Sequence, residues 1–292
     1  MNIYPFEWKQ VLVLLLILLL FQPASAEEKL GNDDKILIMG VFPIVSGVAL
    51  FKRFAPLKDY LSKNLGREIR LETARDFPTF VSRTAEHYYD IVITAPHFSV
   101  LAADSGDYQI VARPTQDLES LVVVSETSAI KDLSQLAGQK IATPPAPALT
   151  TRSTNKYLED TGLKGDKAPE YLAHKSHNAA YQAVLVNNAA AAIVSNNAVN
   201  KALDQGIALR IIGKAPPLPA MATLVSTRLP VGFALDVENA LVTMADSDEG
   251  RAVLYKVGFP GYISARLKDY DPVRPYKPAN SNIGVPQQKI VK

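Results

Sequence analysis

The alternation of short apolar runs with amphipathic stretches is the feature that most constrains this chain. Residues 35–41 (KILIMGV) are almost wholly apolar, as in a buried β-strand. They precede a stretch whose apolar residues lie three or four positions apart, which predicts one buried helix face. Pro56 interrupts this pattern and predicts a bend or a late start, and Gly66 predicts the helix end. The apolar positions are Leu50, Phe54, Leu57, Leu61 and Leu65.

The same alternation continues along the chain, with helical patterns between short apolar runs. Strands joined through helices form mainly parallel sheets that are covered on both faces, so the sequence predicts an α/β fold. Beyond Lys268 the chain is rich in Pro, Asn, Lys and Gln, which predicts a tail that wraps the surface or is partly disordered. The predicted strands are residues 35–41, 68–73, 89–94, 120–124, 140–143, 170–172, 190–194, 209–212 and 222–226.

The N-terminal segment has the pattern of an export signal. Residues 11–21 (VLVLLLILLLF) form an unbroken apolar run, which is shorter than the roughly 20 residues of a membrane-spanning helix. Ala24 and Ala26 place small residues at the −3 and −1 positions of a signal-peptidase site, so cleavage is expected after Ala26. Lys9 is the one basic side chain before the run, which leaves an uncleaved anchor or a core helix as alternatives.

Composition narrows the class of protein. The chain has 31 Lys and Arg against 29 Asp and Glu, a net charge of +2, which argues against a dedicated nucleic-acid binder. Its 292 residues are 48% hydrophobic, too apolar for a disordered chain. It contains no cysteine, which excludes disulfides, thiolate metal sites and a lipid-modified N-terminal cysteine. With the signal pattern, this predicts a freely diffusing periplasmic protein.

No catalytic or cofactor motif is recognisable. The sequence lacks a Gly-x-Ser-x-Gly elbow, a His-Glu-x-x-His pair and a Gly-Lys-Ser/Thr phosphate loop. His174 and His177 lie three positions apart, but no carboxylate stands at metal-ligand spacing from them. The sequence therefore predicts a protein that is not an enzyme and that uses neither a metal nor a cofactor.

Several fragments, taken in their order and spacing, carry a resemblance to a known family. The chain resembles the phosphate, phosphite and phosphonate-binding periplasmic components of ABC importers over about residues 35–260. Residues 130–142 are a pattern shared by many solute-binding proteins, so they bear on the fold more than on the ligand. The fragments are 38–41 (IMGV), 54–61 (FAPLKDYL), 89–96 (YDIVITAP), 130–142 (IKDLSQLAGQKIA), 177–180 (HNAA), 184–185 (VL) and 191–195 (AAIVS).

This resemblance implies a type II periplasmic binding protein with two lobes that close about a two-strand hinge on a small anionic solute. The hinge strands are expected near residues 121–125 and 222–226. An ABC permease in the inner membrane is the implied partner, and the protein is expected to be a monomer. The expected division is a signal peptide at 1–26, a first lobe formed by 27–122 and 224–268, a second lobe at 123–223, and a tail at 269–292.

Candidate ligand contacts lie in the loops expected after the strands. Ligands of parallel α/β sheets collect beyond the carboxyl ends of the strands, where helix N-termini offer free N–H groups to anions. These loops are rich in hydroxyl, amide and imidazole groups, and Arg152 adds a guanidinium suited to an anion. Each hydroxyl is equally suited to capping a helix. The candidates are Phe42, Ser46, Thr94, His97, Thr150, Thr151, Arg152, His177, Ser195 and Asn196.

The resemblance also suggests roles for some candidates. His177 matches a family histidine that contacts the oxyanion. The family often has a phosphate cradle with glycine where residues 144–151 (PPAPALTT) stand; Thr150 and Thr151 are its nearest match, and the glycine is missing. Where members that bind aminophosphonates often carry Asp, this chain has Ser195 and Asn196, which favours a ligand without an amine.

Two alternatives remain open at this stage. The departure from the family's cradle is compatible with a periplasmic sensory module that presents its liganded form to a membrane receptor. It is equally compatible with a binder of a different small solute. An enzyme built on the same two-lobe fold is a weaker third reading, because no catalytic set is present. Neighbouring permease and ATPase genes, or a receptor gene, distinguish import from sensing.

Overall fold

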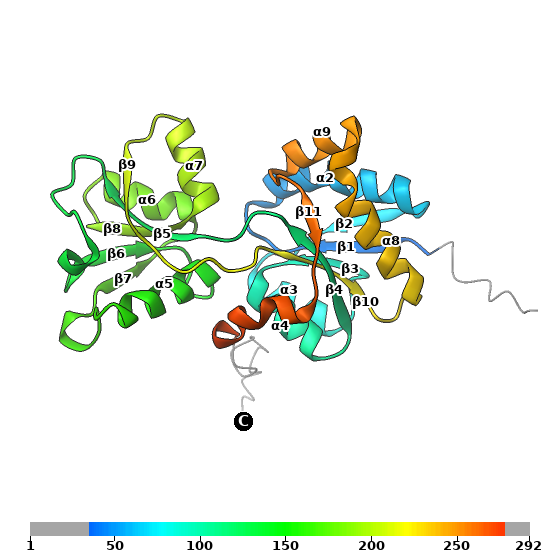
Figure 1. Cartoon of the computed structure of the whole chain (residues 1–292), viewed down its shortest axis with the longest axis horizontal. Helices are drawn as coiled ribbons and strands as arrows, with labels where there is room; N and C mark the ends of the chain where they lie inside the picture. Colours follow the sequence, from blue (N-terminus) through cyan, green and yellow to red (C-terminus); the bar gives the residue numbers. More distant parts are fainter. Residues whose placement is uncertain (1–34, 278–292) are drawn as a thin grey trace, which may run out of the picture. The chain divides into compact units, whose positions relative to one another are not determined.

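The structure, a computed structural model, describes residues 35–277. The predicted signal peptide and residues 278–292 lie outside the described residues. The described chain forms two β-sheets, one of six strands and one of five, each with helices packed on both of its faces (Figure 1). The predicted α/β fold with two sheets is confirmed, but both sheets are mixed, and the expectation of mainly parallel sheets is wrong.

In the six-stranded sheet the strand order is β11-β4-β10-β3-β1-β2. Parallel pairing is confined to β2, β1 and β3, while β10 and β11 pair antiparallel with their neighbours. Strand β10 returns to this sheet from the five-stranded one, whereas β11 is reached later, through helices that pack on the same sheet. The strands are β1 (Leu37–Val41), β2 (Ile69–Glu72), β3 (Ile91–Thr94), β4 (Tyr108–Pro114), β10 (Ala222–Ser226) and β11 (Tyr262–Ser264).

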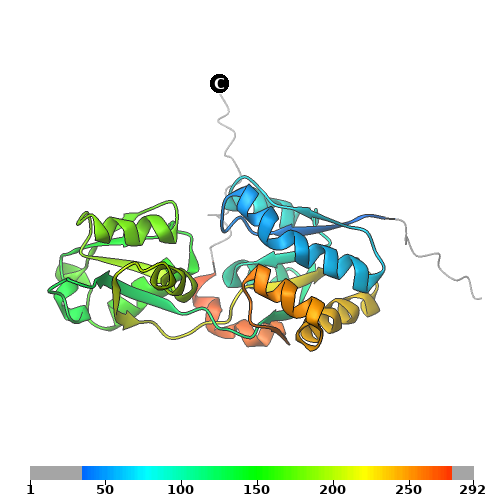
Figure 2. The ribbon, with the colours of Figure 1, turned by 90° about the horizontal axis from the view of Figure 1, so that it is seen from above.

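Two helical layers cover this sheet. Helices α2 (Gly47–Leu65), α8 (Val231–Val242) and α9 (Asp248–Val257) bury one face, and α2 runs beside the other two (Figure 2). The opposite face is covered by α3 (Phe77–Ala85), α4 (Pro96–Asp104) and the 3₁₀ segment η4 (Leu267–Tyr276). A short 3₁₀ turn, η3 (Met244–Asp246), joins α8 to α9.

The five-stranded sheet has the order β7-β6-β8-β5-β9, with parallel pairing among β7, β6 and β8 and antiparallel pairing of β5. Helices α6 (His177–Leu185) and α7 (Asn196–Asp204) cover one face, and α5 (Leu149–Asp160) covers the other with η1 (Leu133–Leu136). The 3₁₀ turn η2 (Gly165–Lys167) follows α5. The strands are β5 (Ser120–Ser125), β6 (Lys140–Thr143), β7 (Glu170–Ala173), β8 (Ala191–Ser195) and β9 (Leu209–Lys214).

The segments that connect the two sheets lie a few residues before the expected hinge strands. Strand β5 lies wholly in the five-stranded sheet and β10 wholly in the six-stranded one, so the chain crosses at 115–119 and 215–221. A β-bridge between Leu118 and Leu218 joins these two segments. An apolar run identifies a strand but not the sheet that it joins, because pairing partners lie far away in sequence. The exact domain boundaries stay predictions.

Three local features differ from the sequence pattern. Helix α2 continues through Pro56, because the burial of Phe54, Leu57 and Leu61 outweighs the hydrogen bond that proline cannot donate. Strands β4 and β11 were not predicted. The described part of the tail forms η4, where Tyr270 and Val273 are fully buried and Arg274 pairs with Asp104 of α4.

Candidate functional site

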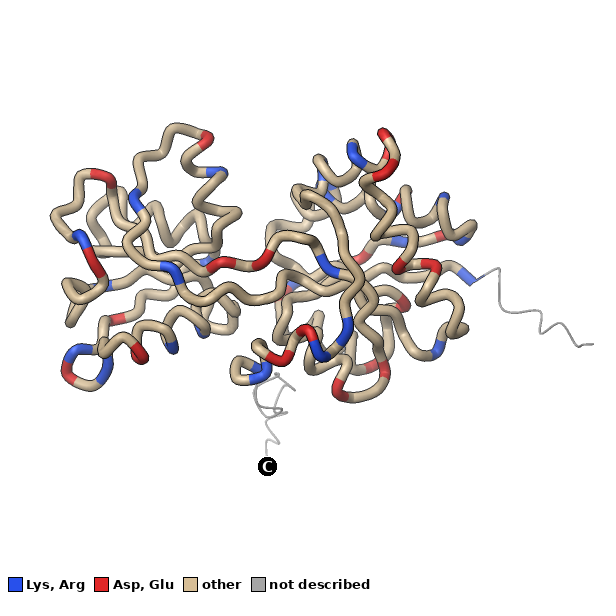
Figure 3. Tube along the Cα trace, in the orientation of Figure 1, with Lys and Arg blue, Asp and Glu red and all other residues tan. Residues whose placement is uncertain are grey.

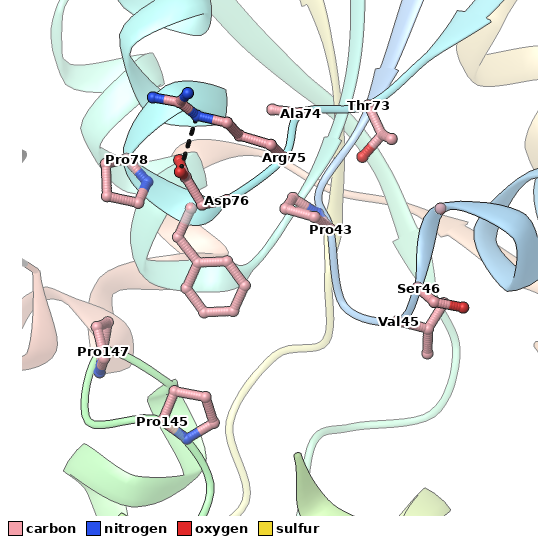
Figure 4. A pocket seen from close by; sticks show the side chains of 12 residues that line it. Pro43, Val45, Ser46, Thr73, Ala74, Arg75, Asp76, Pro78, Pro145 and Pro147 are labelled. Atoms are coloured by element: carbon pink, nitrogen blue, oxygen red, sulfur yellow. Dashed lines mark hydrogen bonds and ion pairs between the residues drawn. The ribbon is translucent and has the colours of Figure 1, made fainter. Parts of the chain in front are cut away.

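A pocket of about 630 Å³ opens where the loops after β1 and β2 meet the loop before α5. Its lining includes Val45, Ser46 and Phe77, together with proline rings from several segments (Figure 4). Of the ten predicted contacts, all of which are described, Ser46 is the one that lines it. The hydroxyl of Ser46 makes no capping bond to α2, although Ser46 is the residue that precedes the helix.

The charged side chains of this pocket are engaged with each other. Asp76 accepts a hydrogen bond from the Thr79 N–H at 2.8 Å, which caps α3, and another from Arg75 Nε at 3.2 Å. These hydrogen bonds hold the pKa of Asp76 below its usual value. The α3 N-terminus is therefore already occupied by a carboxylate and offers less positive potential to an anion.

The N-terminus of α5, by contrast, has no side-chain cap. Ala148 precedes the helix and offers no side-chain cap, and the first turn contains no acidic residue. The first intrahelical bond runs from the Arg152 N–H to the Ala148 carbonyl at 3.1 Å, so the N–H groups ahead of Arg152 have no partner within the helix. A helix start of this kind attracts anions.

The two threonines of this turn have different surroundings. The Thr151 hydroxyl donates to the Pro144 carbonyl at 3.2 Å. Thr150 is 3% exposed, and its hydroxyl is buried with no hydrogen-bond partner among the described residues. An unpaired buried hydroxyl raises the free energy of the folded protein. This cost is removed if a bound group accepts a hydrogen bond from the hydroxyl. Thr150 is therefore the stronger candidate of the pair.

His97 connects helix α4 to the loop before α5. Its Nε2 lies 3.0 Å from the Pro147 carbonyl, which can only accept, so Nε2 holds the proton and Nδ1 is left buried without a partner among the described residues. Burial, together with the nearby Arg152, lowers the pKa of His97 to about 3. The ring is therefore neutral at neutral pH, and its Nε2–H donates a hydrogen bond to the Pro147 carbonyl.

Arg152 is half-buried, and its guanidinium makes no hydrogen bond or ion pair with another described residue. It lies close enough to His97 to lower the pKa of that ring. An unpaired guanidinium one turn into α5 can form two parallel hydrogen bonds with an oxyanion. The structure thus places Arg152, which follows Thr150 in α5, near His97 of α4; their contact with a ligand stays a prediction.

His177 begins α6 and has a defined tautomer. Its Nδ1 accepts a hydrogen bond of 3.2 Å from the Ser195 N–H, so the neutral ring holds its proton on Nε2. Burial lowers the pKa of His177 to about 4. At neutral pH the ring is therefore an uncharged donor through Nε2, which suits an anion that must later be released.

Ser195 and Asn196 have structural partners. Ser195 caps α7 by accepting from the Ala198 N–H at 3.4 Å, which is the alternative role considered for such hydroxyls. The Asn196 amide donates to the Asp117 carbonyl at 3.2 Å and lines a second pocket of about 270 Å³ with Glu119 and Lys214. These two residues lie apart from the first pocket's lining.

Phe42 and Thr94 lie inside the six-stranded part. The Phe42 ring packs against Phe77 at 4.4 Å and Phe98 at 5.1 Å between centroids, and the residue is 3% exposed. Its packing partners indicate that it supports the loop before α2 from within the core. Thr94 is buried at the end of β3, with a hydroxyl that has no partner among the described residues.

Sequence reasoning missed Phe77, Pro145 and Pro147 as lining residues. The proline-rich loop has a visible sequence signal, since residues 144–147 (PPAP) lie three to six positions before Thr150. No sequence signal marks Phe77 as a lining residue, because its position depends on packing against Phe42.

Residues 35–277 contain neither a metal-binding cluster nor a membrane-spanning helix. This part of the chain holds no group of three or more His, Asp or Glu side chains placed to bind a metal ion. None of its helices combines the length and apolarity needed to span a bilayer. Lys and Arg are interleaved with Asp and Glu along this part, without a concentrated basic stretch (Figure 3).

Comparison with solved structures shows the same fold. A binding protein component of an ABC phosphonate transporter from Pseudomonas aeruginosa matches with a TM-score of 0.71 and 15% identity, over 84% of this chain and 86% of that one. A Prochlorococcus marinus protein in complex with methylphosphonate matches with a TM-score of 0.71 and 17% identity, over 83% and 97%. A Xanthomonas citri protein bound to ATP gives 0.67 and 18%, over 82% and 98%.

A family model gives the assignment. The model described as "ABC transporter, phosphonate, periplasmic substrate-binding protein" matches residues 39–270, which is most of the chain and nearly all of its described part. The two-sheet fold accords with this match. The chain therefore belongs to the phosphonate-type periplasmic substrate-binding proteins of ABC transporters.

Proposed function

We propose that this protein captures a small phosphorus oxyanion (phosphate, phosphite or a phosphonate) at the start of α5 and delivers it to an ABC permease. The observation that carries the proposal is the uncapped first turn of α5, where the Thr150 hydroxyl is buried and unpaired. A bound oxyanion accepts from that hydroxyl and from the free N–H groups of the turn, which removes the cost of leaving them unpaired.

Arg152 and His177 are proposed as further hydrogen-bond donors to the anion. Arg152 provides the cationic contact, and His177 provides a neutral N–H through Nε2. The Thr151 hydroxyl is already donated to Pro144, so its role is to hold the loop in place. A single cation among neutral donors binds the anion firmly and still permits release to the transporter.

Calorimetric titration tests this proposal. Protein that has been unfolded, dialysed and refolded to remove retained ligand is titrated with phosphate, phosphite and methylphosphonate, with sulfate as a comparison. We expect saturable binding of at least one phosphorus oxyanion. Absence of heat for all of them, from protein with native circular dichroism, contradicts the proposal.

Export and assembly follow from the same assignment. We expect secreted protein to begin at Glu27, because residues 24–26 fit a signal-peptidase site, and to diffuse freely as a monomer. N-terminal sequencing and light scattering measure both. Retention of residues 1–26, or a stable dimer, contradicts these expectations. The family match favours import over the sensory alternative, and neighbouring permease and ATPase genes are the expected context.

A further inference from the structure

The pocket beside α5 has rigid apolar walls. Pro43 follows β1, Pro78 lies in the first turn of α3, and Pro145 and Pro147 precede α5 (Figure 4). Proline has no N–H to donate and a nearly fixed φ, so these four residues line the pocket from two sides with surfaces that are ordered in advance and donate no backbone hydrogen bond. We call these surfaces together the proline wall. The wall therefore favours an apolar group in contact with it.

Val45 and Phe77 extend this apolar surface. Phe77 also packs against the core residue Phe42, with 4.4 Å between ring centroids, which fixes its position. The pocket volume of about 630 Å³ far exceeds the space that a methyl group occupies. It has room for an alkyl chain or an aromatic ring.

The same lining carries no net negative charge that would attract an ammonium group. Asp76 is its acidic residue, and both the Thr79 N–H and Arg75 already donate to it. The Arg75 side chain is 85% exposed and remains in solvent. A cationic amine that enters this pocket competes with Arg75 for Asp76 and gains little net attraction, whereas an apolar group gains contact with the proline rings.

The pocket and the proposed anion site are joined through one loop. Pro145 and Pro147 line the pocket, and α5 begins at Leu149. The His97 hydrogen bond to the Pro147 carbonyl holds this loop in place. Pro147 stands two residues before the first residue of α5, so a group that extends toward the pocket from an oxyanion at that turn meets the proline wall.

From these observations we infer, on the basis of the proposed function, that the ligand is a phosphonate with an uncharged apolar substituent, which lies against the proline wall. An alkyl or aryl phosphonate fits this description, and an aminoalkyl phosphonate does not. Pro145, Pro147, Phe77 and Val45 are the residues that determine this specificity.

Four ligands test the inference by calorimetry on the ligand-free protein: methylphosphonate, propylphosphonate, phenylphosphonate and 2-aminoethylphosphonate. Affinity should rise from methyl to propyl, by up to about fourfold for each buried methylene, and phenylphosphonate should also bind more tightly than methyl. The aminoethyl compound has the same length as propyl and should bind at least about tenfold more weakly than propyl. The inference is overturned if 2-aminoethylphosphonate binds as tightly as propylphosphonate or more tightly. It is also overturned if methylphosphonate, propylphosphonate and phenylphosphonate bind with equal affinity.

A pair of variants locates the substituent. Val45 lines the pocket and is 41% exposed, whereas Val48 is 84% exposed and lies outside the lining. Val45→Glu adds a carboxylate to the pocket and should raise the affinity for 2-aminoethylphosphonate relative to propylphosphonate at least about fivefold. Val48→Glu adds the same charge nearby and should leave this ratio within about twofold of that of the unchanged protein. A ratio that Val45→Glu does not change, or that both variants change equally, overturns the placement.

Failure of the proposed function has a different signature. If neither inorganic phosphate nor any of the four phosphonates binds, the oxyanion site itself is wrong and the inference fails with it. If phosphate and methylphosphonate bind while the ranking of the larger ligands is reversed, the oxyanion site stands and only the inference about the substituent fails.

Discussion

The backbone N–H of Ser195 donates a hydrogen bond of 3.2 Å to Nδ1 of His177. This one contact between the end of β8 and the start of α6 decides which nitrogen of the ring holds the proton. The Nε2–H is then available to a ligand, and the ring is neutral because burial lowers its pKa to about 4. The tautomer is thus set by backbone geometry and does not depend on a neighbouring acid.

This geometry predicts how substitutions of His177 behave. His177→Ala should weaken methylphosphonate binding about tenfold or more, because a hydrogen bond to a charged group contributes about 1.5–3 kcal/mol. His177→Gln retains an N–H donor and should recover a large part of the affinity. Calorimetry measures both variants, with thermal unfolding as the check on folding. Unchanged affinity in the alanine variant removes His177 from the site.

Thr150 offers a test in which stability and affinity move in different directions. Thr150→Val removes a buried hydroxyl that has no partner, so the free energy of unfolding should stay equal or rise by up to about 1–3 kcal/mol. Methylphosphonate affinity should fall at least about fivefold, because the ligand loses a donor. Thr150→Ser keeps the hydroxyl and should keep the affinity. Urea unfolding and calorimetry separate the two effects, and a valine variant with full affinity refutes a role for this hydroxyl.

The two buried histidines predict how stability depends on pH. The pKa is about 3 for His97 and about 4 for His177, against 6.5 in the unfolded chain. Above pH 6.5 both rings are neutral in both states. As the pH falls below 6.5 the unfolded chain binds protons that the folded chain does not, so the free energy of unfolding decreases until each folded pKa is passed.

The contribution of one ring can be isolated by substitution. His97→Gln keeps a donor for the Pro147 carbonyl and has no group to titrate. Between pH 6 and 4.5 the free energy of unfolding of this variant should fall less steeply, by up to about 1.4 kcal/mol per pH unit. Urea unfolding at several pH values measures the slope. Parallel pH dependence in the variant and the unchanged protein contradicts the low pKa of His97.

Substitution of Gly40 tests the packing beneath the loop after β1. A Cβ at this position meets the Tyr89 ring at 2.5 Å, and Tyr89 is fully buried. Gly40→Ala should therefore lower the free energy of unfolding by about 1–3 kcal/mol. Gly47→Ala is a suitable control, because a Cβ there meets no atom within 4 Å.

The coupling between Gly40 and Tyr89 gives a second measurement. The double variant Gly40→Ala with Tyr89→Leu should lose less stability than the two single variants together, since the smaller side chain removes the clash. Strict additivity in urea unfolding shows that the alanine is accommodated in some other way. Loss of stability in Gly47→Ala equal to that in Gly40→Ala shows that the effect is not steric.

The sequence by itself determined the elements that depend on local order. The stripe from Leu50 to Leu65 forms α2 and ends at Gly66, which has a φ of 61°, as its pattern predicts. Runs such as residues 89–94 and 190–194 became strands β3 and β8. Helix periodicity, strand length and glycine at a helix end are properties of neighbouring residues, so they can be read without knowing the fold.

Only the tertiary structure decided which sheet each strand joins and what each candidate side chain contacts. Thr150 and Thr151 are the same residue type in adjacent positions, yet one hydroxyl is unpaired and the other donates to Pro144. Successive side chains point about 100° apart around a helix, so neighbours meet different surroundings. Phe42 was a predicted contact, but long-range packing with Phe77 and Phe98 places it in the core. Contacts between residues far apart in sequence depend on how the elements pack, and no local pattern records them.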